Sequence, residues 1–226
     1  MNWLGVMGVI NPLQVEKLLE LTPLKNKDLV VGILVNENVF DGVPDPSQRY
    51  RYPKDVKEIP EIFNFGGEKN ESIQKFVKLY WEDDHLLNLW LRWLAELELE
   101  GAIDGIMLSG YPRPEELAEL KFSFPLVDII LDVGELSVDG IEVLDEYKDN
   151  IEGVIVKAST DIKVVRELMK KYPFFDLGFY GMYTPEEFNR VRQFPYAGAL
   201  LEEEVRTNED HLDLVAAAEY LKKLAL

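Results

Sequence analysis

The feature that most constrains the fold is a regular alternation of short apolar runs with helix-like stretches. Eight such units can be counted in 226 residues, and no linker or low-complexity segment separates them. Near-continuous apolar runs joined by helical crossovers are typical of a parallel sheet that helices cover. The predicted strands are residues 3–10, 28–36, 61–65, 103–110, 126–133, 151–159, 174–182 and 196–203.

Eight strand–helix units in a chain of this length predict a (β/α)8 TIM barrel, formed as a single domain over residues 1–226. A doubly wound open sheet is the main alternative, but no G-x-G-x-x-G motif follows any predicted strand. Two helix starts agree with the barrel, because "TPEE" at 184–187 and "STD" at 159–161 offer hydroxyls as N-caps.

Two long segments follow the second and third predicted strands. Residues 37–60 contain four prolines and are predicted to form a long loop. Loops of this length are often lids or binding loops, and this one would lie on the barrel face where active sites are found. Residues 66–100 are predicted to be mainly helical.

The charge and the amino-acid content exclude several classes of function. There are 42 acidic against 24 basic residues, a net charge of −18, which repels nucleic acid and anionic membrane surfaces. There is no Cys, so disulfides, Cys-ligated zinc and thiol catalysis are excluded. His85 and His211 are the two histidines, which argues against a His-based metal site or a Ser-His-Asp triad.

The start of the chain lacks the basic segment of a signal peptide, and no apolar run approaches the ~20 residues of a membrane helix. We therefore expect a cytoplasmic protein. Abundant Leu, Glu and Lys without Cys also fit a thermophile. Trp81, Trp90 and Trp93 lie in a stretch that is apolar nearly all round, so part of it is expected in the core and part against a partner subunit.

Polar residues at the predicted strand ends are the candidate functional site, because catalytic groups of this fold gather at the C-terminal ends of the strands. Their convergence on one rim predicts a site for a small-molecule substrate. The candidates are Asn11, Asn36, Glu37, Asp41, Asn64, Ser109, Asp132, Lys157, Ser159, Tyr180, Gly181, Glu202 and Glu203.

Lys157 is distinctive among these candidates because it ends an apolar strand. A desolvated amine at this position would have a lowered pKa and could form a Schiff base. The alternative is an ion pair with a neighbouring carboxylate such as Asp132 or Glu202. Those two carboxylates also suit Mg²⁺, but no ligand spacing is diagnostic, and we expect neither a metal nor another cofactor.

Several motifs together resemble the tryptophan synthase α chain family over most of the chain. "GILVNENVFDG" is similar to its second strand, where a Gly precedes an Asp-Gly at a nine-residue spacing, which Gly32 and Asp41 match. "GAIDGIMLSGYPRPEELAEL" looks like its fourth unit, and "LGFYGMYTPEEFNRV" resembles its seventh. "YAGALLEEEV" lies where that family has its final Gly-rich strand.

This resemblance implies a lyase of tryptophan biosynthesis that cleaves indole-3-glycerol phosphate and passes indole to a PLP-dependent β chain. The β chain is the protein partner that the resemblance implies, and self-association is the alternative. Asp41 would polarise the indole N–H. The acid–base Glu of the family falls at Val30, and the nearby Glu37 is its candidate replacement.

The implied phosphate site departs from the family pattern. Such a site depends on backbone N–H groups of Gly-rich turns at helix N-termini. Gly181 keeps this pattern, whereas "KASTD" at 157–161 lacks the glycine and the eighth strand runs into the acidic residues 202–204. Carboxylates oppose a phosphate, so these residues argue against the usual substrate.

A shorter stretch, "VIVKAST", resembles the sixth strand of deoxyribose-phosphate aldolase, in which a Lys-x-Ser-Thr motif supplies the Schiff-base lysine. Lys157 would take that role. The second lysine of that family is missing from "DLGFYGM", and Asp161 stands where a glycine is expected. The sequence thus leaves three hypotheses, namely an α-chain-like carbon–carbon lyase, a Schiff-base aldolase, and a barrel that keeps a ligand or partner surface without catalysis.

Overall fold

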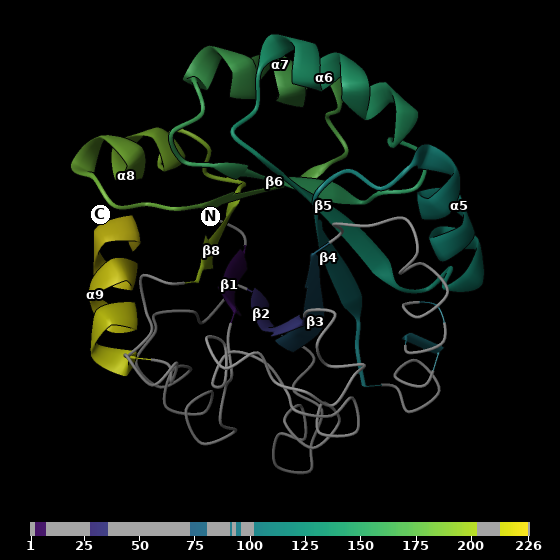
Figure 1. The fold of residues 1–226 in the computed structure, drawn as a ribbon. Coiled ribbons are helices and arrows are strands. Elements are labelled where there is room, and N and C mark those ends of the chain that lie inside the picture. Colours follow the sequence, from purple (N-terminus) through teal and green to yellow (C-terminus); the bar gives the residue numbers. More distant parts are fainter. Residues whose placement is uncertain are drawn as a thin grey trace, which may run out of the picture.

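The fold is a closed barrel of eight parallel strands (Figure 1). The computed structural model describes residues 3–7, 28–35, 73–80, 91, 94–95, 102–202 and 213–225. The strands are β1 Trp3–Met7, β2 Asp28–Val35, β3 Ile73–Tyr80, β4 Gly105–Ser109, β5 Asp128–Gly134, β6 Gly153–Lys157, β7 Asp176–Tyr180 and β8 Gly198–Leu201. The barrel closes where β1 pairs with β8, with Leu4 opposite Ala199. The predicted (β/α)8 barrel is confirmed.

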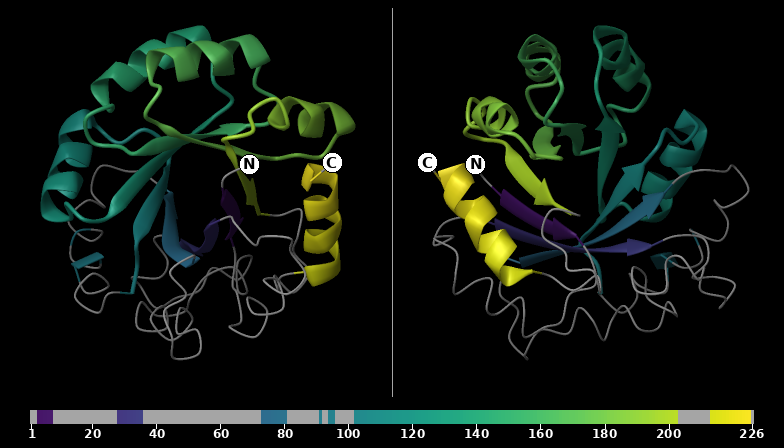
Figure 2. Two further views of the ribbon diagram at one scale, coloured as in Figure 1. Left: turned by 180° about the vertical axis from the view of Figure 1, so that it is seen from behind. Right: turned by 60° about the vertical axis from the view of Figure 1, so that its left-hand side comes forward.

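The helices pack around the outside of the strands. Figure 1 shows α5 to α8 as an arc around one side of the barrel, and Figure 2 shows α9 beside β8 and β1. Among the described residues, no helix has the length and apolar character needed to cross a membrane. The bounds are α5 Pro114–Ser123, α6 Val138–Val143, the short 3-10 turn η2 Leu144–Glu146, α7 Ile162–Lys171, α8 Pro185–Val191 and α9 Leu214–Ala225.

Side-chain alternation along the strands divides the core into two layers. Residues such as Val77 and Leu108 face outward and join a large apolar cluster beneath the helices. The opposite positions face into the barrel and form a second cluster. Its buried members are Trp3, Met7, Val30, Phe76, Met107, Ile130, Ile155 and Leu200.

Glycines make room for the bulky side chains inside the barrel. A Cβ atom at Gly178 or Gly198 would overlap the indole of Trp3, and one at Gly32 would overlap the thioether of Met7. Large residues and glycines on neighbouring strands therefore complement each other. This arrangement closes the interior below the C-terminal ends of the strands with apolar side chains.

The third strand differs from the prediction. Residues 73–80, which were expected in a helical region, form β3, and its register with β2 and β4 is continuous. Ile73, Val77 and Leu79 pack in the outer cluster, whereas Phe76 lies on the inner face, as side chains that alternate along a strand must. Lys75 and Lys78 interrupt the apolar run, so the segment lacks the continuous apolar pattern of the other strands. The predicted strand at 61–65 lies outside the described residues.

The helix caps follow the sequence with one correction. The Thr184 hydroxyl accepts the backbone N–H of Glu187, and the Glu187 carboxylate accepts that of Thr184, so the predicted cap of α8 is confirmed as a capping box. The cap of α7 is the carboxylate of Asp161, which accepts the N–H of Lys163, and not a hydroxyl. Thr160 is buried and accepts the N–H of Leu136 instead.

The long loop predicted at 37–60 lies outside the described residues, and so does most of the tryptophan-rich stretch. The three tryptophans and two histidines in question are Trp81, Trp90, Trp93, His85 and His211. Within the tryptophan-rich stretch, Leu91 and Leu94 are described and are helical, and Leu94 is fully buried. That burial agrees with the expectation that part of this stretch contributes to the core.

Candidate functional site

A buried lysine on β3 is the centre of the candidate site. Phe76 points into the barrel and its neighbours Val77 and Leu79 point outward, so Lys78 points inward at the C-terminal end of the strand. Only 2% of the Lys78 surface is exposed. A lysine is almost never this deeply buried unless acidic groups compensate its charge.

Two carboxylates from other strands provide this compensation. The Nζ of Lys78 lies 2.8 Å from Oδ2 of Asp132 on β5 and 2.5 Å from Oε1 of Glu202, which directly follows β8. Burial alone would lower the pKa of Lys78, but the attraction of Glu202 and Asp132 outweighs it and raises this pKa above its ordinary value. The lysine therefore carries its positive charge throughout the physiological pH range.

Asp132 is held in place by further hydrogen bonds. The hydroxyl of Ser109, at the end of β4, donates to Oδ2 over 3.1 Å. The backbone N–H of Gly134 donates to Oδ1 over the same distance. Gly134 has φ +65, in the left-handed region that favours glycine, where the chain leaves β5. The carboxylate of Asp132 is thus fixed by groups on three strands.

Two tyrosines extend the site towards solvent. The Nζ of Lys78 lies 5.4 Å from the ring centroid of Tyr180, at the end of β7, which is within range of a cation–π interaction. Burial and the negative charge of Asp132 raise the pKa of Tyr180 to about 12. Tyr111 follows β4 and is 46% exposed, and burial of its remaining surface also raises the pKa of its hydroxyl.

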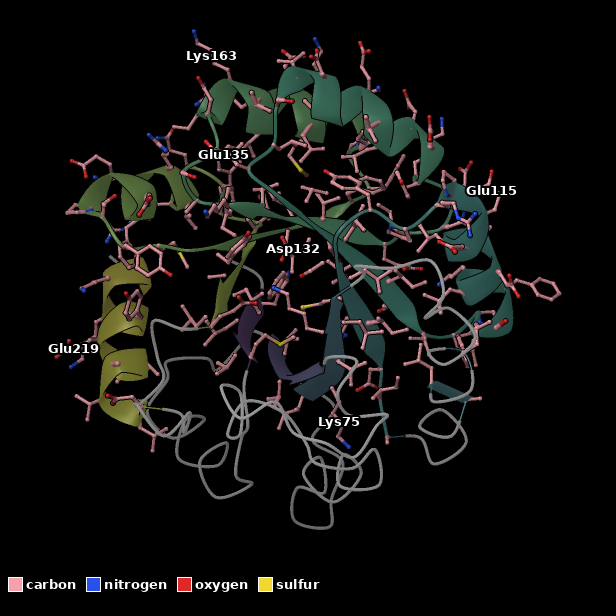
Figure 3. All side chains as sticks on the ribbon, viewed as in Figure 1. Lys75, Glu115, Asp132, Glu135, Lys163 and Glu219 are labelled. Carbon is pink, nitrogen blue, oxygen red and sulfur yellow. The ribbon has the colours of Figure 1, made fainter. Side chains whose placement is uncertain are left out.

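These side chains surround a cavity of about 380 Å³ at the C-terminal end of the barrel. The size suits a small molecule. Figure 3 shows Asp132 directed into the middle of the barrel, whereas Lys75, on the same strand as Lys78, points away from it. The lining residues are Lys78, Ser109, Gly110, Tyr111, Asp132, Val133, Gly134, Tyr180 and Glu202.

The structure brings together four of the residues that the sequence predicted for the site. Ser109, Asp132, Tyr180 and Glu202 all line the cavity. Lys78 was missed because its strand was expected to be helical. The signal in the sequence is weak: Ile73, Val77 and Leu79 lie at even spacings, which in a strand would put them on one face and Lys78 on the other.

Three further candidates are at the rim but do not line this cavity. Lys157 ends β6 as predicted, but its side chain is exposed, so the expected desolvation of its amine does not occur. The buried lysine that pairs with Asp132 and Glu202 is Lys78 instead. Gly181 lies directly after β7 with φ +69, against Lys157 and Tyr183, and Ser159 is half-buried.

The remaining six predicted site residues lie outside the described residues. They are Asn11, Asn36, Glu37, Asp41, Asn64 and Glu203. Val30 is described, faces the barrel interior on β2 and is 3% exposed. The position that the family resemblance assigns to a catalytic Glu is therefore part of the apolar layer below Lys78.

The positive charge between the two carboxylates is an ammonium group. Asp132 and Glu202 both contact Lys78, which occupies the place that a shared cation would take. Within the described part of the chain, no group of three or more His, Asp or Glu side chains is arranged to hold a metal ion. The chemistry available here is proton transfer and electrostatic stabilisation by Lys78, Glu202 and Tyr180.

Comparison with solved structures shows several barrel enzymes of the same fold. Phosphoribosyl anthranilate isomerase from Thermus thermophilus matches with a TM-score of 0.66 at 12% identity, covering 100% of this chain and 98% of that one. The tryptophan synthase α chain of Legionella pneumophila gives 0.62 at 11%, covering 99% and 90%. Orotidine 5'-monophosphate decarboxylase from Methanocaldococcus jannaschii gives 0.59 at 11%, covering both chains fully.

No protein-family model and no curated protein matches the sequence. At these identities the similarity to solved structures shows the fold alone. The tryptophan synthase α chain, which the sequence resembles, is one of several barrel enzymes with this architecture. A shared fold does not determine an activity, which depends on the residues that line the cavity.

Proposed function

We propose that this chain is an acid–base lyase that cleaves a carbon–carbon bond of a small carbonyl compound in the cavity above Lys78. The observation that carries the proposal is the buried ammonium of Lys78, held between Asp132 and Glu202 at the C-terminal end of the barrel. A fixed positive charge in a site shielded from water stabilises negative charge that develops during a reaction.

The residues fit the steps of a retro-aldol cleavage. Glu202 takes the proton from the β-hydroxyl group of the substrate, and the carbon–carbon bond breaks as the new carbonyl forms. The electron pair of that bond moves to the original carbonyl, which becomes an enolate. Lys78 stabilises the enolate oxygen and Tyr180 donates a hydrogen bond to it, until the enolate carbon accepts a proton from Glu202. Asp132 positions Lys78.

The raised pKa of Lys78 favours this mechanism over covalent catalysis at that residue. A Schiff base requires a neutral amine, and the two carboxylates keep Lys78 protonated. A Schiff-base aldolase that uses Lys157 is the alternative, supported by its place at the end of β6 and by the Lys-x-Ser-Thr resemblance. Its exposed amine lacks the desolvation that activates such lysines.

Indole-3-glycerol phosphate is the first substrate to test, because the sequence resembles the tryptophan synthase α chain. This compound has no carbonyl, so its indole ring, once protonated at C3, would accept the electron pair of the broken bond in place of the carbonyl. Asp41 would then polarise the indole N–H, and Glu37 remains a second candidate acid–base group. We expect the purified chain to release indole, measured by chromatography. β-Hydroxy ketones and β-hydroxy aldehydes extend the assay to other retro-aldol substrates.

Variants identify the residues that act. We expect Glu202→Gln to lower kcat by about 10²–10⁴-fold, the usual effect of removing an acid–base group. Lys78→Arg keeps the charge but not the shape, and Tyr180→Phe removes the donor, so both should lower kcat as well. Lys75→Met, on the same strand but the outer face, is the matched control and should retain activity.

Three results would overturn the proposal. The first is turnover that survives Glu202→Gln and Lys78→Arg unchanged in folded protein. The second is a covalent adduct on Lys157 after borohydride reduction with a carbonyl substrate, which would support the aldolase. The third is the absence of cleavage across the whole substrate panel, which would support a barrel without catalysis.

A further inference from the structure

Three turns at the opposite, N-terminal end of the barrel are built in the same way. The segments "FPLV" at 124–127, "YPFF" at 172–175 and "FPYA" at 194–197 each precede a strand. In each of them the N–H of the fourth residue donates to the carbonyl of the first, over 3.2, 3.2 and 3.0 Å. Proline in the second position sets the backbone of such a turn.

The backbone angles show how closely two of these turns agree. Phe124 has φ −129 and ψ 68, and Tyr172 has φ −125 and ψ 72. Each of these aromatic residues is buried and follows the last residue of a helix. Its N–H donates to the carbonyl of a leucine one helical turn earlier. The chain therefore enters these two turns with the same backbone conformation.

The third residue of each turn is apolar and yet almost fully exposed. Leu126 is 88% exposed, Phe174 94% and Tyr196 81%. Together with Phe122, they are the four most exposed large apolar side chains among the described residues. Polar residues and glycine are common in turns, so folding does not require apolar side chains here. Their repetition indicates a surface that another molecule covers.

Carboxylates lie at the same end of the barrel as these apolar side chains. Asp104, Asp128, Glu152 and Asp176 lie at the starts of the four consecutive strands β4 to β7. Lys121 contacts Glu152 over 2.6 Å. Burial raises the pKa of Asp128 and of Asp176, and the negative charge of Glu152 raises both further. Lys121 pairs with Glu152, and Lys148 and Lys171 pair with Asp145, so Asp128 and Asp176 contribute negative charge that these ion pairs do not involve.

A cleft of about 560 Å³ lies beside the turn before β7. Phe174 lines it together with the four carboxylates of Asp145, Asp149, Glu152 and Asp176. Lys148 and Lys171 also line it, and both contact Asp145. We call this surface the basal face, defined by Leu126, Phe174, Tyr196, Asp128, Glu152 and Asp176.

We propose that the basal face binds a basic and apolar segment of another protein, with apolar side chains on Leu126 and Phe174 and a Lys or Arg in the cleft beside Asp176. Charge complementarity decides between occupants. A second copy of this chain would bring its own acidic surface, with a net charge of −18, against the same carboxylates. The proposal is independent of the reaction at the other end of the barrel.

A synthetic peptide of alternating Leu and Lys, labelled with a fluorophore, tests this directly against the full chain by fluorescence anisotropy. We expect Leu126→Ser with Phe174→Ser to weaken binding at least about tenfold, because the double variant removes both apolar anchors of the proposed interface. The matched control is Val138→Ser with Val215→Ser, at side chains that are 60% and 71% exposed on α6 and α9. We expect this control to bind like the wild type.

Two more peptides separate charge from apolar contact. Replacing Lys by Glu should abolish binding, and replacing Leu by Ser should weaken it as much as the double variant does. Equal binding by the two double variants would show general attraction to an acidic protein and would overturn the proposal. So would a dimer, detected by analytical ultracentrifugation, that Leu126→Ser with Phe174→Ser dissociates, because a second copy would then be the occupant.

Discussion

Replacing Lys78 by Met should destabilise the fold by an amount that the geometry sets. Both carboxylates contact the same Nζ, at 2.8 and 2.5 Å, so their oxygens lie at most about 5.3 Å apart. Two like charges at that distance repel by about 3 kcal/mol at an effective dielectric constant near 20. Breaking a buried ion pair typically costs about 3–5 kcal/mol. We expect Lys78→Met to lose about that much unfolding free energy at pH 7.

The pH dependence of the variant tests the cause. Without Lys78, the folded state holds two close like charges that the unfolded chain keeps apart. Acid neutralises carboxylates, so the penalty should decrease as the pH falls. Chemical denaturation at pH 8 and at pH 5 should therefore show a smaller deficit at the lower pH.

A second substitution separates repulsion from lost packing. Adding Glu202→Gln to Lys78→Met removes one of the two like charges, so most of the lost stability should return. Lys75→Met serves as the control because its side chain points away from the barrel interior. The reasoning is wrong if Lys78→Met unfolds at the wild-type denaturant concentration, or if its deficit is the same at both pH values and persists in the double variant.

Two further outcomes follow from other parts of the structure. Gly198→Ala should cost about 1–3 kcal/mol, because its methyl group would overlap the Trp3 indole, and adding Trp3→Phe should recover part of this loss in thermal unfolding. Tyr180 keeps its proton up to about pH 12, whereas it would titrate near 10 in the unfolded chain, so its contribution to stability is lost as the pH rises through that interval. Absorbance titration should show a late tyrosinate step that Tyr180→Phe removes.

Most of the barrel could be predicted because its strands are buried on both faces. Strands such as β5 and β6 read as continuous apolar runs, and each is followed by a helix. The third strand was not predicted at its true position because Lys78 interrupts the apolar pattern. A charged residue on the inner face of a barrel strand contradicts the burial rule, and what makes it stable is contact with Asp132 and Glu202, which are distant in sequence.

The same distance in sequence limits prediction of the site. Asp132 and Glu202 could be named because each ends a predicted strand, but the sequence does not show which cation lies between them. Lys157 was expected to be the desolvated amine because "VIVK" is apolar. Lys157 is exposed because it is the last residue of β6, at the edge of the barrel. The position of that edge is set by the assembled barrel and not by the local sequence. Local sequence patterns predicted which residues lie at the ends of the strands. The ion pairs between residues of different strands, which determine the chemistry of the site, could not be predicted in this way.

The apolar layer of Trp3, Met7, Val30 and Phe76 also bears on how molecules would reach Lys78. Among the described side chains this layer lies beneath the lysine, and Tyr111 and Tyr180 line the cavity next to it. Two fragments of a cleaved substrate would leave along the path by which the substrate entered, one after the other. The residues at the C-terminal end of the barrel would then control the order in which the products leave. A ligand on the basal face would lie at the opposite end, away from that path.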